Sequence, residues 1–201
     1  MSRIIVDSIR NSSAGSDGIT LSSDCKVAFP NTSTGKILQV IQNVKTDTAS
    51  MSVQQSETAI PGTDQNGSGS IYCVKITPSS TSSKILFKVA LNHGSTNDQI
   101  SGGILYRDST ALGLATSAGS RKAVTFPFPY IPDADASNPI IYTAYYEYLD
   151  SPSSTSELTY SVKYYNHHSD ANYINQSIRD SASTTYDLRT SSTLTVMEVA
   201  A

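Results

Sequence analysis

The stretch KILFKVALN, residues 84–92, decides the fold class of this chain, because its apolar residues alternate with a period of two. Successive side chains of a β-strand point to opposite faces, so every second residue here would share one face. The residues on that face are Ile85, Phe87, Val89 and Leu91. The pattern predicts a strand with one side in a hydrophobic core.

Alternating runs of the same kind recur over most of the chain, whereas the helical period of 3.6 residues is nearly absent. Turn-forming residues separate the runs, among them Pro61-Gly62 and Asn66-Gly67. The clearest further runs are 35–45, 71–77, 140–149, 157–166 and 193–199, with weaker ones at 103–107 and 122–126. This spacing predicts an all-β fold, and the long irregular loops favour a jelly-roll-like β-sandwich over a simple meander.

The first 35 residues differ from the rest and predict a short N-terminal β anchor segment, followed by the sandwich over residues 36–201. Three short apolar bursts, RIIVDSIRN (3–11), DGITLSSD (17–24) and KVAFPN (26–31), are joined by small polar turns. A segment of this size cannot bury enough surface to fold alone. We expect it either to dock on another subunit or to fold back as an edge hairpin. Apolar strands at both chain ends also favour a subunit of an assembly.

The bulk composition argues against several classes of partner. The 201 residues carry a net charge of −3 with a pI near 5.5, which leaves no basic footprint for nucleic acid or an anionic membrane surface. No apolar run approaches the roughly 18 residues of a transmembrane helix, and no signal peptide is recognisable. We therefore expect synthesis in a cytoplasm, no nucleic-acid partner and no membrane insertion.

Enzyme signatures are missing, and the sequence predicts no catalytic site, cofactor or metal. It contains no Gly-rich phosphate loop, G-x-S-x-G, HExxH or CxxC motif, and its two cysteines are interpreted as free thiols. His167, His168 and Asp170 form a metal-like cluster, but without identifiable further ligands they are interpreted as loop residues. His93 is interpreted as a turn residue, and Glu198 as an outward, solvated carboxylate.

Tyrosines are concentrated on two predicted strands, residues 140–149 and 157–166. On the first of these they occupy both faces, so one set is expected in the core and the other against a second surface. Tyrosine rings suit subunit contacts and sugar stacking alike, and a subunit contact is preferred over a ligand here. The candidate residues for subunit or glycan contact are Tyr142, Tyr145, Tyr146 and Tyr165.

Several segments resemble small virion proteins of tailed bacteriophages, notably those of marine and cyanobacterial hosts. The opening MSRIIVDSIRNSSAGSDGITLSSD (1–24) is similar to their S-x-I-x-V-D-x-I start, which a short Gly-containing turn follows. SSKILFKVALN (82–92), ILYRDSTALGLATSAGSR (104–121) and STLTVMEV (192–199) are similar to the β-rich outer domain of such fibre proteins. The resemblance touches most of the chain through loose patterns of strands and turns.

The resemblance implies a homotrimeric virion subunit that binds other virion proteins of the tail or capsid. It places the anchor between Arg3 and Arg10, with Ile4, Val6 and Ile9 as its apolar contacts. No extended shaft is present, so a short tail fibre or appendage is expected, contacting the host surface and its glycans. A capsid decoration protein of the head-fibre or cement type is the alternative. A free carbohydrate-binding lectin and a depolymerase are lesser alternatives.

Overall fold

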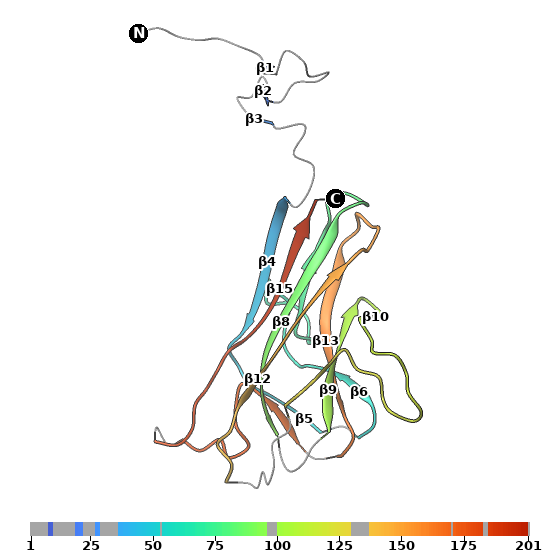
Figure 1. The fold of residues 1–201 in the computed structure, drawn as a ribbon. Helices are drawn as coiled ribbons and strands as arrows, with labels where there is room; N and C mark the ends of the chain where they lie inside the picture. The colour runs from blue at the N-terminus through green and yellow to red at the C-terminus, as the bar shows by residue number, and fades with distance from the viewer. Residues whose placement is uncertain are drawn as a thin grey trace.

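The computed structural model describes residues 8–9, 19–21, 27–28, 36–52, 54–95, 100–129, 137–169, 171–182 and 185–200. These residues form strands, turns and loops, and the described ranges contain no helix. Three short strands, β1 (Ser8–Ile9), β2 (Ile19–Leu21) and β3 (Val27–Ala28), pair with one another in that order. The other strands build two antiparallel sheets (Figure 1), which confirms the all-β prediction.

Within the described residues, the first sheet contains six strands that occupy four positions across its width, because two pairs of strands lie end to end. Its strands are β4 (Ile37–Lys45), β5 (Ala49–Met51), β8 (Lys84–Ser95), β12 (Tyr142–Asp150), β14 (Asn172–Ile174) and β15 (Ser192–Val199). β12 pairs along one edge of β8, while β15 and β14 pair end to end along its other edge. β4 and β5 then continue the sheet beyond β15 and β14.

The second sheet repeats this arrangement. Its strands are β6 (Glu57–Ala59), β7 (Cys73–Ile76), β9 (Ser101–Arg107), β10 (Thr110–Leu112), β11 (Phe126–Pro127) and β13 (Leu158–Asn166). β13 pairs with β9 along one edge and with β7 and β6 along the other. β10 and β11 extend the sheet on the far side of β9.

The strand order identifies the fold type. Along the chain the strands form eight runs, namely β4–β5, β6–β7, β8, β9, β10–β11, β12, β13 and β14–β15. The first run pairs with the eighth, the second with the seventh, the third with the sixth and the fourth with the fifth. One long hairpin wound around a two-sheet core in this way is a jelly roll. The prediction of a jelly-roll-like sandwich is therefore confirmed.

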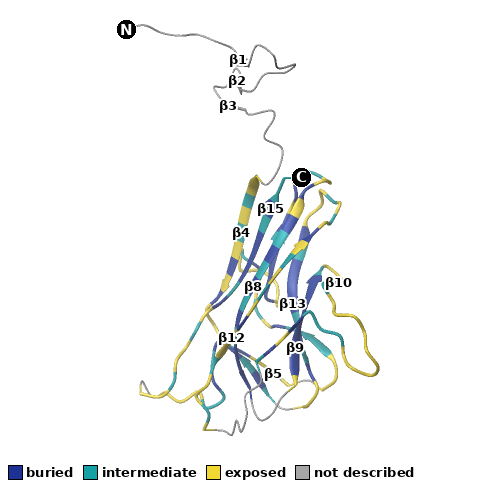
Figure 2. Cartoon of the chain, in the orientation of Figure 1, coloured by how far each residue is buried: buried dark blue, intermediate teal, exposed yellow. Residues whose placement is uncertain are grey.

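The hydrophobic core lies between the two sheets, where every second residue of the central strands is buried (Figure 2). Apolar burial of this kind contributes about 25 cal/mol per Å² of area removed from water. The most deeply buried members on β8 and β13 are Ile85, Phe87, Val89, Leu91, Tyr160, Val162 and Tyr164. The alternation seen in the sequence is thus the inward face of each sheet.

A buried polar tie also joins the sheets. Arg107 on β9 donates through Nη1 to both carboxylate oxygens of Asp150 on β12, at 2.9 and 2.7 Å. The hydroxyl of Tyr160 on β13 donates to the same carboxylate at 2.8 Å. Asp150 is buried at the end of β12, one residue beyond the alternating run 140–149 of the sequence. β9 and β13 are neighbours in the second sheet, whereas β12 belongs to the first, so the tie links strands of different sheets.

The interpretation of His93 as a turn residue is wrong. His93 lies inside β8 and is completely buried, because the alternation that buries Leu91 continues for one more step. Its ring packs 4.6 Å from that of Phe128 and 5.9 Å from that of Tyr164, measured between centroids. Its Nε2 atom lies 3.2 Å from Oδ1 of Asn172.

The interpretation of Glu198 as a solvated carboxylate is also wrong. Glu198 is completely buried on β15, and Ser79 donates to it from its backbone N and its hydroxyl at 2.7 and 2.6 Å. Gln39 Nε2 donates to its other oxygen at 2.7 Å. Burial raises the pKa of this carboxyl, but hydrogen bonds from Ser79, Ser83 and Gln39 outweigh it and lower the pKa to about 2.

The sandwich has two distinct ends. Residues 36 and 200 lie side by side at one end, where the backbone N of Ala200 donates to the carbonyl of Lys36 at 2.8 Å. β15 runs towards this end, so the loop that precedes it, between β14 and β15, lies at the opposite end (Figure 1). We call this opposite end the distal end.

Candidate functional site

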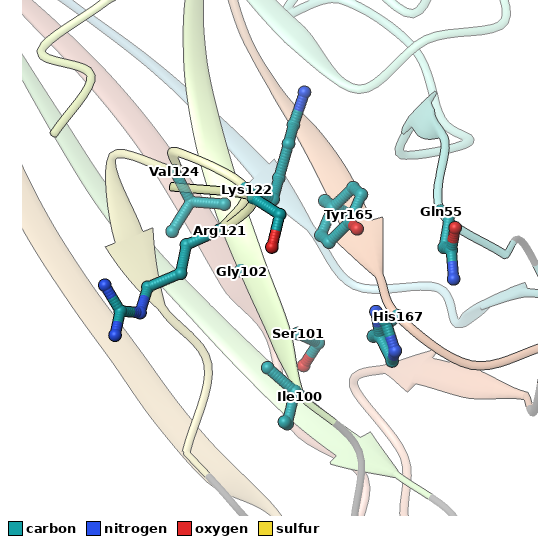
Figure 3. Close-up of a pocket in the computed structure, with 10 residues that line it drawn as sticks. Gln55, Ile100, Ser101, Gly102, Arg121, Lys122, Val124, Tyr165 and His167 are labelled. Carbon is teal, nitrogen blue, oxygen red and sulfur yellow. The ribbon is translucent and has the colours of Figure 1, made fainter. Parts of the chain in front are cut away.

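A groove of about 570 Å³ opens on the second sheet, between the ends of β9 and β13 and the loop that precedes β11 (Figure 3). Figure 3 shows Gln55, Tyr165 and His167 on one side, with Arg121 and Val124 on the other. The residues that line the groove are Gln55, Ile100, Ser101, Gly102, Ser120, Arg121, Lys122, Val124, Tyr165 and His167. The groove therefore combines apolar walls with cationic, amide and aromatic groups.

Two glycines explain how the loop comes close enough to form a wall. A Cβ atom on Gly102 would lie 2.9 Å from side-chain atoms of Val124, and one on Gly103 would lie 2.2 Å from the ring of Phe126. Only a residue without a side chain allows this close approach. The Phe126 ring in turn stacks on Tyr146, with 5.5 Å between the ring centroids. The wall is thus fixed to the core.

A network around Glu57 borders the groove. Lys122 Nζ lies 2.6 Å from one carboxylate oxygen of Glu57, and the hydroxyl of Tyr106 donates to the other at 2.5 Å. Burial raises the pKa of Glu57, but hydrogen bonds from Lys122 and Tyr106 outweigh it, so the pKa is lowered. The hydrogen bond to Glu57, together with burial, raises the pKa of Tyr106 to about 12. Glu57 is therefore the ionised partner of both groups at neutral pH.

Cation–aromatic pairs accompany this network. Lys122 Nζ lies 5.5 Å from the ring centroid of Tyr165, and Lys163 Nζ lies 3.9 Å from that of Tyr106. Such pairs contribute about 0.5–1 kcal/mol at exposed sites. They hold the long lysine side chains against the sheet and leave Lys122 in a defined position at the groove.

The backbone of Gln55 is strained at the groove. Its φ is +49°, in the left-handed region that residues with a side chain rarely adopt. Its backbone N donates to the carbonyl of Asn166 at 2.7 Å, which holds the residue beside the end of β13. Strain of this kind persists where the surrounding structure dictates it, and it is concentrated at ligand-binding sites.

The predicted tyrosines divide between three environments. Tyr142 and Tyr145 on β12 are exposed, whereas Tyr146 is half-buried on Phe126 and packs against the core. Tyr165 lines the groove. Of the predicted anchor, Ile4 and Val6 lie outside the described residues, and Ile9 is described only as backbone in β1.

The outward face of the first sheet carries a row of apolar side chains that crosses all four runs of chain. Met197 on β15 is paired with Val40 on β4 and with Leu86 on β8, and Leu86 is paired with Leu149 on β12. Val40 is 55% exposed and Leu149 is 49% exposed. We call Val40, Met197, Leu86 and Leu149 the outer apolar row.

The row next to it is polar. Thr195 is paired with Gln42 and Lys88, and Lys88 with Glu147. Gln42 Nε2 donates to Thr195 Oγ1 at 2.9 Å, and Lys88 Nζ lies 3.6 Å from a Glu147 oxygen. This face therefore offers apolar contact beside charges of both signs.

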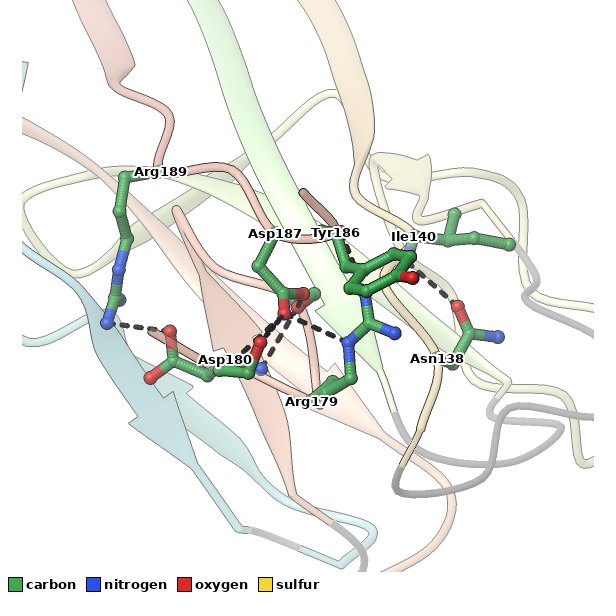
Figure 4. Close-up of polar contacts among 9 residues, drawn as sticks. Asn138, Ile140, Arg179, Asp180, Tyr186, Asp187 and Arg189 are labelled. Carbon is green, nitrogen blue, oxygen red and sulfur yellow. Dashed lines mark hydrogen bonds and ion pairs between the residues drawn. The ribbon is translucent and has the colours of Figure 1, made fainter. Parts of the chain in front are cut away.

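The loop before β15 forms an ordered polar cluster at the distal end (Figure 4). Asp187 accepts hydrogen bonds from Ser177 Oγ and Arg179 Nε, both at 2.9 Å, and from Ser181. These hydrogen bonds lower the pKa of Asp187 to about 2, and the one from the Ser181 side chain has the largest effect. Beside this cluster, Tyr186 is 65% exposed and Leu188 is 73% exposed. Tyr186 and Leu188 are thus displayed beside a hydrogen-bonded polar cluster.

The remaining motifs hold no recognisable chemistry. His167 and His168 are exposed, with ring centroids 5.0 Å apart, and Asp170 lies outside the described residues. Within the described ranges, no group of three or more His, Cys, Asp and Glu side chains could hold a metal ion. Cys73 is buried as a free thiol. Among the same residues, no helix is long and apolar enough to span a membrane.

No protein-family model and no curated protein sequence matches this chain. Among solved structures, the VP2 subviral particle of infectious bursal disease virus matches at 13% identity and a TM-score of 0.43, over 87% of this chain and 35% of that chain. A structure of the Gt strain of that virus matches at 14% identity and a TM-score of 0.41, over 91% of this chain and 42% of that chain. This chain spans less than half of either length. Similarity at these values carries no argument about function.

Proposed function

We propose that this protein is a structural subunit of a tailed-phage virion, in the form of a short homotrimeric tail fibre or appendage. The outer apolar row is the observation that carries the proposal. Apolar side chains that reach the surface next to one another mark interaction surfaces, and here Val40 and Leu149 are exposed while Met197 and Leu86 between them are half-buried. Jelly rolls serve viral and carbohydrate-binding proteins, which supports the proposal by analogy of fold.

The layout of the sandwich suits an appendage. Residues 1–35 join it at the end where residues 36 and 200 lie together. An anchor in this segment, with Ile4, Val6 and Ile9 as its apolar contacts, would leave the distal end facing away from the particle. The exposed Tyr186 and Leu188 would then meet the host surface first. Repeated copies would raise avidity without a tight single site.

The test is quantitative mass spectrometry of purified particles, with this chain compared with the major capsid protein. We expect a ratio of a few per cent, on the order that a small number of tail appendages gives. A ratio near one to one would make the chain a capsid decoration protein instead. Absence from particles would contradict every virion role and favour the free lectin.

The same experiment tests the anchor. A variant lacking residues 1–35 should fold, because the two sheets are built from residue 37 onwards. We expect this variant to be soluble and absent from particles. Unfolding of the variant would show that the segment belongs to the core, and incorporation into particles would contradict an anchor in this segment.

A further inference from the structure

We propose that the groove beside Tyr165 binds a sugar acid, that is, a carboxylate-bearing residue of a surface polysaccharide. The inference rests on the proposed host contact and names its ligand class. At about 570 Å³ the groove lies in the size range of small-molecule sites. It also has the composition of such sites, with apolar walls and a few polar groups that converge from separate segments.

The charge of the groove selects an anion. Lys122 is neutralised by Glu57 at 2.6 Å. Arg121 forms no ion pair within the described ranges, and the one hydrogen bond of its guanidinium there is a long one, 3.5 Å to the carbonyl of Ala118. One positive charge therefore remains unmatched at the rim. A guanidinium binds a carboxylate through two parallel hydrogen bonds, which makes Arg121 the selective group.

The Tyr165 ring and the Gln55 amide can bind the parts of a sugar other than its carboxylate. Tyr165 presents an aromatic surface on which the apolar face of a pyranose can stack, and Ile100 and Val124 add apolar wall. Gln55, held by its strained backbone, offers an amide that can donate to and accept from hydroxyl groups. In Figure 3 Gln55 lies on the same side as Tyr165, with Arg121 across the groove. The guanidinium of Arg121 extends away from Tyr165 in this view, so it would reach the carboxylate of a sugar stacked on Tyr165 by rotation of its long side chain.

The test uses the full chain and three acidic probes, namely hyaluronan tetrasaccharide, tetragalacturonate and 3′-sialyllactose. The neutral counterpart of the two acidic tetrasaccharides is N-acetylated chitotetraose, and that of 3′-sialyllactose is lactose. Binding is followed by isothermal titration calorimetry and by NMR shifts of the groove residues. We expect at least one acidic probe to bind about tenfold or more tightly than its neutral counterpart, in a salt-dependent way. Failure of all three acidic probes, or equal binding of acidic and neutral probes, overturns the inference.

Two variants and a control locate the site. Arg121→Gln should weaken the acidic probe about tenfold or more and leave neutral probes unchanged, since it removes only the charged contact. Tyr165→Ala should weaken both kinds of probe. Lys84→Gln makes the same charge change at an exposed position on β8, outside the groove, and should change neither. An unchanged affinity in folded Arg121→Gln, or a loss in Lys84→Gln equal to it, contradicts the site.

The outcome is separable from that of the proposed function. A chain that is present in particles but binds none of the acids overturns this inference and leaves the virion role standing. A chain that is absent from particles but binds an acid through Arg121 supports the groove and contradicts the virion role. Circular dichroism of each variant shows whether a loss of binding reflects the groove or the fold.

Discussion

His93 is a titratable side chain enclosed in the core of the sandwich. Burial disfavours the charged imidazolium and lowers its pKa from 6.5 to about 4, although the hydrogen bond with Asn172 opposes this shift. In the unfolded chain the imidazole is free to take up a proton near pH 6.5. Between these two pH values the unfolded state binds more protons, so acid favours unfolding. The stabilising effect of a neutral His93 is complete above pH 6.5 and is lost as the pH falls towards 4.

We predict that His93→Gln removes this part of the pH dependence. Gln keeps a polar partner for Asn172 but does not titrate. Between pH 7.5 and pH 4.5 the wild-type free energy of unfolding should fall by about 2 kcal/mol more than that of the variant. Urea unfolding of both proteins at the two pH values measures this difference. Carboxylates with lowered pKa values, such as Glu198 and Asp187, are common to both proteins and cancel. Equal pH dependence would show that His93 does not titrate on unfolding.

For His93 and Glu198, the position on the strand predicts burial better than the polar residue type does. His93 and Glu198 both continue an inward alternation, so their position on the strand alone predicts burial. The polar side chain suggested a turn or a solvated site instead. The hydrogen-bond partners of these two buried residues, however, come from distant parts of the sequence. Ser79 lies 119 residues from Glu198, and Asn172 lies 79 residues from His93. No local pattern predicts such partners.

At the scale of elements, the buried tie between β9, β12 and β13 predicts a specific loss of stability. Asp150→Asn removes the charge that Arg107 and Tyr160 both approach, so the half-buried Arg107 cation loses its partner. We expect a loss of about 2–3 kcal/mol, because breaking one side of a buried pair leaves an uncompensated charge. Glu157→Gln is the matched control, since Glu157 is exposed just before β13 and lies away from the outer apolar row. It should change stability by less than about 0.5 kcal/mol. Thermal and urea unfolding compare the two, and equal losses would contradict the tie.

Elements and their faces followed largely from the sequence, but the groove did not. The inward face of β8 was predicted residue by residue, because burial follows from alternation. The groove joins residues near positions 55, 100, 121 and 165, which the chain brings together only through the pairing of β9 with β13 and β11. Only Tyr165 was a candidate beforehand, since aromatic residues on a strand are visible without tertiary structure. The adjacent glycines 102 and 103 mark a close approach, but the sequence does not say of what.

At the scale of the whole molecule, the sequence predicted a jelly-roll-like sandwich but not its pairings. Alternation defines which residues face inward, whereas the pairing of the first run with the eighth depends on the complete topology. That pairing also creates the outer apolar row. Val40 and Met197 are 157 residues apart in the sequence, and each alone is an ordinary surface residue. Only their alignment across four runs makes a continuous apolar row.

A second copy of this chain is the occupant that we propose for the outer apolar row, as part of the homotrimer. Apolar side chains beside Lys88 and Glu147 allow two copies to match both contact and charge. Native mass spectrometry and light scattering of the full chain should then show a trimer. Val40→Glu combined with Leu149→Glu should give a folded monomer, because a buried, unpaired carboxylate costs several kcal/mol. Thr110→Glu combined with Ser156→Glu places the same charges at exposed sites away from the row and should leave the trimer intact. A monomeric wild-type chain, or a double variant that remains trimeric, would place the subunit contact elsewhere.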